Sequence, residues 1–234
     1  MNSRKEPFVN NEHYHIFSRG IDKRQTFMDT TDVERFVQSI KEFNALDSIG
    51  SIFENSFRKK KQSEYVVSKE KLVEFICYCI NPNHYHFILK QLVDGGISEF
   101  MKRMGGYTKF FNEKYNRSGS LFERPFKSVH ISSDSYLLHL SVYVNLNYKV
   151  HQLGRNTSKL VRSSWDEYMG KTEGFCICNK DIILGRFNNI NEYKEFAIKT
   201  LPDIIERKQD LRNMLLEEEE DEHLDDLDVL RPSD

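Results

Sequence analysis

The stretch Asn81 to Lys90, with the sequence NPNHYHFILK, decides how this chain is interpreted. Asn-Pro-Asn is a turn signal, because proline fixes φ and asparagine tolerates tight conformations. The residues after the turn are mostly β-branched, aromatic or otherwise apolar, which predicts a strand that begins at His84. Side chains alternate between the two faces of a strand, so His84 and His86 share one face. Two imidazoles about 6 to 7 Å apart on a strand can hold one metal ion, although they can equally be solvated or hydrogen-bonded to neighbours.

The composition predicts a soluble, globular protein with a substantial core. The chain has 234 residues, of which 38% are hydrophobic and 30% charged, as in ordinary globular domains. It contains no run of 18 apolar residues, and its first residues, MNSRKEPFVNN, lack the apolar centre of a signal peptide. The four cysteines form two C-x-C pairs, which rarely bridge internally. We therefore expect a cytoplasmic protein with reduced thiols and no membrane partner.

Charge is distributed unevenly along the chain. Of 34 basic and 36 acidic residues, two and ten lie in residues 211–234, which leaves 32 and 26 in the rest. A net positive body suits a polyanionic partner. The acidic end is too poor in apolar residues to offset its ordering entropy, so we expect a disordered tail over 211–234. The predicted organisation is a catalytic domain over 1–154, a mostly helical appendage over 155–210, and this tail.

Hydrophobic periodicity predicts the order of the elements. Strands are expected over 13–20, 73–80 and 84–89. Helices are expected from an N-cap at Thr30 or Thr31 to 46, over 97–115, over 135–150, and over 190–200 and 201–216. The segment 120–131 reads as extended. Gly105 and Gly106 fall inside the helix at 97–115, which indicates a kink or close packing against another backbone.

Two histidines, an oxygen donor and a tyrosine together suit phosphodiester chemistry. The metal would polarise the phosphate, and a tyrosine would attack phosphorus. Tyr143 and Asn147 lie four residues apart in a predicted helix and so share a face. Spacing alone does not separate Tyr143 from Tyr107 and Tyr115. Nor does it separate the pair His84 and His86 from a second H-x-H pair, His13 and His15.

Several motifs in order carry a family resemblance. They are INPNHYHF at 80–87, HYHIFSRG at 13–20 before it, and YTKFFNEKY, SGSLFERPFKS and SYLLHLSVYVNLN after it. This series resembles the single-tyrosine HUH transposases, in particular the REP-associated tyrosine transposase-like group, in which two histidines flank a bulky apolar residue. Tyr85 fills the middle place here. The resemblance runs from His13 to about Tyr168, with a weaker continuation to about residue 200.

The resemblance implies a fold, an activity and roles for named residues. It implies an α+β, ferredoxin-like sandwich with an antiparallel sheet and helices on one face. It makes His84 and His86 metal ligands for Mg²⁺ or Mn²⁺, Tyr143 the nucleophile, and Asn147 the third ligand or its neighbour. The implied reaction cleaves and rejoins single-stranded DNA, often beside a hairpin, through a 5′-phosphotyrosine, in a monomer or homodimer. Candidate DNA-binding residues are Arg19, Lys23, Arg24, Arg124 and Lys127.

The chain departs from the family pattern in two places. Many relatives have Asn-Pro where this chain has Asn147-Tyr148, and proline would end a helix that tyrosine need not end. Many also have Gly-Arg-Phe before Lys-Ser, where this chain has Arg124-Pro125-Phe126. The second departure moves the candidate phosphate-binding arginine by one position.

Two other functions fit the same residues. One is a DNA-binding protein that recognises a hairpin without cutting it. The other is a structural zinc protein, because zinc favours thiolate and imidazole ligands and C-x-C pairs lie in the sequence, although zinc ligands usually come as C-x₂₋₄-C. The cysteines concerned are Cys77, Cys79, Cys176 and Cys178.

Overall fold

The computed structural model describes residues 7–55, 70–151, 159–171 and 176–217. It contains a five-stranded sheet in the order β4-β1-β3-β2-β5, and every neighbouring pair of strands is antiparallel. The strands are β1 (His13–Arg19), β2 (Val73–Asn81), β3 (His84–Gln91), β4 (Lys127–His130) and β5 (Arg162–Ser163).

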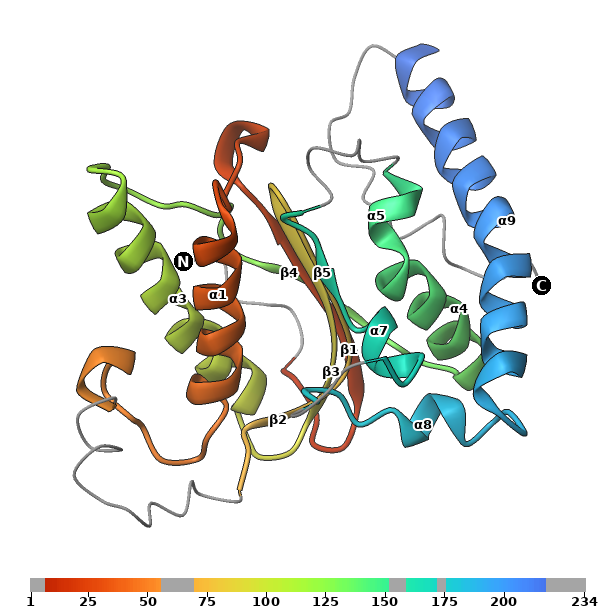
Figure 1. Ribbon diagram of the computed structural model, residues 1–234, viewed down its shortest axis with the longest axis horizontal. Coiled ribbons are helices and arrows are strands. Elements are labelled where there is room, and N and C mark those ends of the chain that lie inside the picture. Colours follow the sequence, from red (N-terminus) through yellow and green to blue (C-terminus); the bar gives the residue numbers. More distant parts are fainter. Residues whose placement is uncertain (1–6, 56–69, 152–158, 172–175, 218–234) are drawn as a thin grey trace.

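The first four strands and two helices follow the ferredoxin-like order. The helices are α1 (Thr30–Phe43) and α3 (Gly96–Lys114), so the chain runs β1-α1-β2-β3-α3-β4. The predicted α+β class and antiparallel sheet are confirmed. The sequence placed the helices on one face, whereas Figure 1 shows them on both: α1 and α3 on one side, and α4 with α9 on the other.

Local sequence explains where α1 begins. The Asp29 side chain accepts a hydrogen bond from the Asp32 backbone N–H, and the Asp32 carboxylate accepts one from the Asp29 N–H. This reciprocal capping box satisfies two backbone donors that the first helical turn leaves open. The cap is therefore Asp29, one residue before the predicted Thr30. Downstream, Val33 and Phe36 face the core, as their spacing predicts.

The second helical layer contains α4 (Asp134–Asn145), α5 (Asn147–Val150), α7 (Trp165–Tyr168) and α9 (Ile190–Glu217); α8 (Asp181–Leu184) precedes α9. The helix expected over 135–150 is interrupted at Leu146, whose φ of −112° is not helical. The two helices expected over 190–216 are one, with Pro202 inside it. Because α9 ends at Glu217, the first residues of the expected tail are helical; residues 218–234 lie outside the described part.

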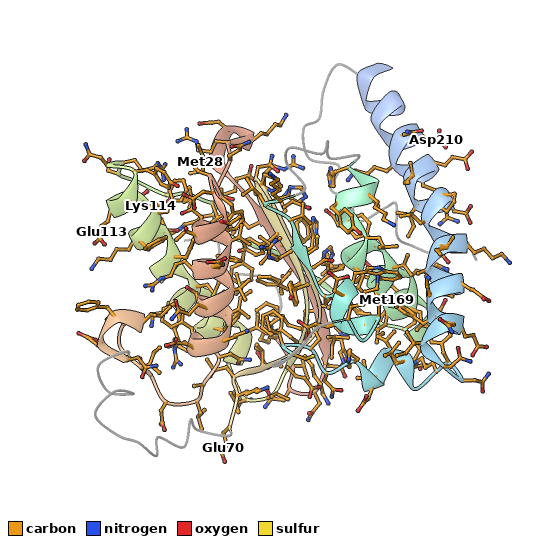
Figure 2. All side chains as sticks on the ribbon, viewed as in Figure 1. Met28, Glu70, Glu113, Lys114, Met169 and Asp210 are labelled. Atoms are coloured by element: carbon orange, nitrogen blue, oxygen red, sulfur yellow. The ribbon has the colours of Figure 1, made fainter. Side chains whose placement is uncertain are left out.

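Aromatic side chains fill the space between the α1/α3 layer and the sheet, and side chains likewise fill the space on the α4 side (Figure 2). The Phe36 ring lies 5.4 Å from Tyr85 and 4.9 Å from Tyr107, measured between centroids. Since Tyr85 points into this core, its neighbours His84 and His86 point to the α4 face. Within the described residues, no helix is both long enough and apolar enough to cross a membrane.

The adjacent glycines of α3 have different surroundings, which generates a matched prediction. A Cβ at Gly105 would meet nothing within 4 Å, whereas a Cβ at Gly106 would lie 3.1 Å from the Phe43 ring. We expect Gly105→Ala to raise the free energy of unfolding by about 1 kcal/mol, through the better helix propensity of alanine. Gly106→Ala should gain clearly less, because the Phe43 ring must shift. Urea denaturation of both variants measures the difference; an equal gain would contradict the packing role of Gly106.

Candidate functional site

The candidate site lies where β2 turns into β3, on the sheet face covered by α4. Asn81 pairs with His84 across β2 and β3, and Phe17 and Arg19 of β1 pair with His86 and His84. Directly paired residues project to the same face. The turn therefore places all five side chains on the side of the sheet where α4 lies.

Three histidines form a cluster that could hold a metal ion. One ring nitrogen from each of His84, His86 and His151 lies within 4.8 Å of the others. His84 and His86 are buried and His151, which caps α5, is half-buried. His151 was not among the metal ligands predicted from the sequence. It follows Tyr143 and Asn147 at a repeated spacing of four residues, so extending that helical stripe by one more turn would have found it.

Asn147 lies against His84, as the predicted third ligand must. Its Oδ1 is 3.1 Å from His84 Nε2, and its side chain is fully buried. The other ring nitrogen of His84, Nδ1, donates to Asn83 Oδ1 at 2.7 Å, which leaves a lone pair on Nε2. Two ligand atoms of an octahedral ion with bonds of about 2.1 Å are about 3.0 Å apart. The His84 and Asn147 atoms therefore fit one edge of such a site.

His15 supports the second ligand from β1. Its Nε2 lies 2.9 Å from His86 Nδ1, and its side chain is fully buried. Metal-bound histidines commonly donate the other ring N–H to a partner that fixes their orientation. When His86 Nδ1–H donates to His15, His86 Nε2 carries the lone pair. The second H-x-H pair thus contributes to the site through His15, a role that spacing could not assign.

Tyr143 of α4 covers the histidines. Its ring meets the His86 ring edge-on, with 5.4 Å between centroids, and the whole side chain is buried. Lys208 of α9 lies above it: the Lys208 ammonium is 5.7 Å from the centre of the Tyr143 ring and donates to His151 Nε2 at 3.0 Å. The site is therefore built from the sheet, the two short helices α4 and α5, and α9.

The competing tyrosines lie on the opposite side of the sheet. Tyr107 is buried in the α1/α3 core, where its hydroxyl donates to the Thr26 carbonyl at 2.6 Å. The Tyr115 hydroxyl donates to the Asp32 carboxylate at 2.8 Å. Burial raises the pKa of the Tyr107 phenol well above its usual range. Of these three tyrosines, only Tyr143 contacts the histidine cluster.

The structure places two of the five predicted DNA-binding residues on the sheet face of the histidines and the other three elsewhere on the surface. Arg19 and Lys127 lie on the same sheet face as the histidines, because Lys127 pairs with Phe17 and Arg19 pairs with His84. Lys23 and Arg24 are exposed after β1, where Arg24 forms an ion pair with Asp22 at 2.7 Å. Arg124 is exposed and lines a shallow pocket against α3. The first two are therefore the basic candidates beside the site.

The cysteines do not join the cluster. All four are free thiols, and among the described residues no cysteine belongs to a group with metal-binding spacing. Burial raises the pKa of Cys77 and of Cys79 to about 12. The thiolate ligands of the structural zinc hypothesis are therefore not assembled here.

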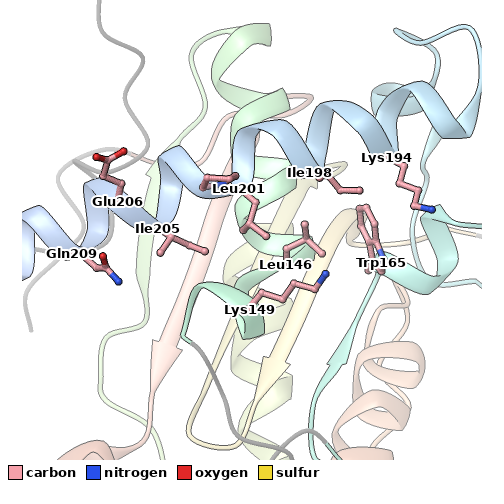
Figure 3. A pocket seen from close by; sticks show the side chains of 10 residues that line it. Leu146, Lys149, Trp165, Lys194, Ile198, Leu201, Ile205, Glu206 and Gln209 are labelled. Atoms are coloured by element: carbon pink, nitrogen blue, oxygen red, sulfur yellow. The ribbon is translucent and has the colours of Figure 1, made fainter.

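A groove of 640 Å³ runs beside α9 but holds none of the site's histidines (Figure 3). Its walls are mainly apolar and include Leu146, Trp165, Ile198 and Leu201, with Lys149 and Lys194 at the rim. The groove follows the packing of α9 against α5 and α7. The chemistry described above lies outside it.

Solved structures similar to this chain include a transposase bound to DNA. A solved structure of a REP-associated tyrosine transposase bound to a REP hairpin aligns with a TM-score of 0.48 and 14% sequence identity, covering 75% of this chain and 93% of that chain. It comes from the family that the sequence motifs resemble. No protein-family model matches the chain, and no curated protein matches it.

The hydrogen bond from His86 to His15 predicts a change in metal affinity. His15→Ala should weaken Mn²⁺ binding by roughly 10- to 100-fold, the usual cost of losing a group that orients a ligand. His13→Ala is the matched control, because His13 lies on the same strand face two residues away and outside the cluster. Isothermal titration calorimetry measures both; equal affinities in the two variants would remove His15 from the site.

Proposed function

We propose that this protein is a metal-dependent nuclease and strand transferase for single-stranded DNA, with Tyr143 as the nucleophile. The observation that carries the proposal is the contact of the Tyr143 ring with His86, inside a cluster of three histidines and Asn147. A tyrosine beside a site of this kind suits attack on a phosphodiester. The ordered sequence motifs, which resemble those of single-tyrosine transposases, support the same reaction.

Different residues of the chain have different roles in the proposed reaction. The Tyr143 oxygen loses its proton and attacks phosphorus, and the bond from phosphorus to the 3′ oxygen breaks. The 3′ oxygen takes up a proton and leaves as a hydroxyl, and the 5′ phosphate remains on the tyrosine as an ester. Attack by a 3′ hydroxyl on that ester reverses the exchange and joins the strands. The positive charges of Arg19 and Lys127 would hold the DNA backbone beside His84. Lys208, which already faces the tyrosine ring, adds a cation where negative charge develops.

His84, His86, His151 and Asn147 would hold the divalent ion. A bound ion would withdraw charge from the phosphate oxygens and so favour attack by the phenol oxygen. The donors suit a divalent ion, because one ring nitrogen of each histidine lies within 4.8 Å of the others and Asn147 Oδ1 lies 3.1 Å from His84 Nε2. Imidazole donors are more typical of transition metals than of Mg²⁺, so Mn²⁺ and Mg²⁺ are both included in the assays below.

Access to Tyr143 is a constraint on this mechanism. The side chain is fully buried, and an oxygen that attacks phosphorus must be exposed to the DNA. The contact of Lys208 with His151 is one of the contacts that must break before DNA can reach the Tyr143 oxygen. This burial is also the observation that favours the second candidate function, a protein that binds hairpin DNA without cutting it.

A covalent adduct assay separates the two functions. Hairpin-containing single strands drawn from the DNA beside the gene carry a label at the 3′ end, so that the fragment joined to the protein keeps it. With Mn²⁺ or Mg²⁺ the wild-type protein should form a labelled adduct that survives denaturing electrophoresis, and EDTA should abolish it. Tyr143→Phe should reduce the adduct at least 100-fold, because the phenyl ring keeps the packing but lacks the oxygen.

Tyr107→Phe is the matched control, since it removes a buried phenol on the other side of the sheet. Its adduct level should equal that of the wild type. An undiminished adduct in Tyr143→Phe would move the nucleophile to another residue. Hairpin binding without an adduct in either metal would favour the non-catalytic function.

A further inference from the structure

Asn81 lies at the centre of the site, in a position that the proposed function does not use. Its amide nitrogen, Nδ2, is 2.9 Å from His84 Nε2 and 2.6 Å from Asn147 Oδ1, and its side chain is fully buried. The same two atoms are 3.1 Å from each other. The amide nitrogen therefore donates one hydrogen to each of the two atoms assigned above as ligands.

These three atoms form a nearly equilateral triangle. Neighbouring ligands of an octahedral ion with bonds of about 2.1 Å are separated by about 3.0 Å, so three of them outline one face of the octahedron. The sides of the triangle at Asn81, His84 and Asn147 are 2.9, 2.6 and 3.1 Å long, which is close to this separation. Two corners carry lone pairs, on His84 Nε2 and Asn147 Oδ1, whereas the third carries hydrogens.

Rotating the Asn81 amide by 180° exchanges its nitrogen and oxygen with almost no change in shape. In the present orientation the Oδ1 atom accepts a weak hydrogen bond from the Cys79 thiol, with an S–O distance of 3.6 Å. A thiol is a weak donor and a weak acceptor, so it can meet either end of the amide.

We propose that Asn81 is a further metal ligand, whose side-chain amide turns its carbonyl oxygen towards a divalent cation that also binds His84 and Asn147. Without the cation, the N–H groups of the amide neutralise the two converging lone pairs. With the cation, the same N–H groups would point at a positive charge, and the oxygen becomes the favourable end. The inference rests on the proposed metal site and adds a ligand to it from strand β2.

The amide in its present orientation would oppose metal binding, so the sign of a mutational effect tests the proposal. Asn81→Leu keeps the size of the side chain and removes both ends of the amide. If Asn81 is a ligand, this variant should bind Mn²⁺ roughly tenfold more weakly than the wild type. If Asn81 only donates to its neighbours, removing the donor should leave Mn²⁺ affinity unchanged or tighten it.

Asn81→Asp provides a second variant should Asn81→Leu fold poorly. It supplies two oxygens and a negative charge at the same corner, and should tighten Mn²⁺ binding roughly tenfold, because ligand charge raises the affinity for divalent ions. Asn145→Leu and Asn145→Asp are the matched controls. Asn145 is another buried asparagine, but its amide donates to Tyr193 and its carbonyl accepts from Ser164, outside the histidine cluster. Both controls should leave Mn²⁺ affinity within twofold of the wild type.

Calorimetry with Mn²⁺ measures the affinities, and thermal unfolding without metal establishes that each variant is folded.

The side-chain NH₂ resonances of Asn81 in ¹H–¹⁵N spectra, assigned by their loss in Asn81→Asp, give a readout that is independent of affinity. They should shift on addition of Mg²⁺, because both hydrogens leave their acceptors; unshifted resonances under saturating Mg²⁺ would overturn the proposal. Wild-type protein that binds neither ion would instead overturn the metal site of the proposed function. Wild-type binding with no weakening in Asn81→Leu would overturn the role of Asn81 alone.

Discussion

The pairing of Asn81 with His84 across the two-residue loop Pro82-Asn83 is the constraint on which the site depends. Register in a hairpin is fixed by its turn, and a slip of one residue would send every side chain of β3 to the other face. His84 and His86 would then enter the aromatic core that Tyr85 and Phe87 now occupy. The turn thus determines that the histidines lie on the α4 side of the sheet and that Tyr85 and Phe87 lie in the aromatic core on the α1/α3 side.

The helices on the α4 side of the sheet cover a cluster of buried polar side chains. Five fully or nearly fully buried side chains in the site are polar: His15, Asn81, His84, His86 and Asn147. A buried polar group without a hydrogen bond costs about 1 to 3 kcal/mol, so the hydrogen bonds within the cluster offset part of the cost of burying it. Here the bonds join three strands and α5. Changing one residue therefore affects its partners, which is why matched controls are needed to interpret any variant.

Sequence reasoning recovered the parts of the fold that repeat with a regular period. Alternation located β1, apolar and strand-forming composition around the Asn-Pro-Asn turn located β2 and β3, and helical spacing located α1 and α3. It could not recover contacts between segments far apart in the chain, such as that of His15 with His86, because no local pattern specifies them. It also could not foresee that α9 passes through Pro202 without a break. Proline removes one helical hydrogen bond, and packing of both halves of α9 along the α4 side of the molecule outweighs that local cost.

The break at Leu146 changes how the helical residues of the site are arranged. A single helix over 135–150 would keep Tyr143 and Asn147 in one stripe, and the sequence predicted their shared face on that basis. The non-helical φ at Leu146 instead starts α5 at Asn147, and α5 ends where His151 reaches the His84 ring, with 4.6 Å between ring centroids. The His151 N–H donates to the Asn147 carbonyl at 3.0 Å, so this single turn holds the Asn147 and His151 side chains one helical turn apart, both beside His84.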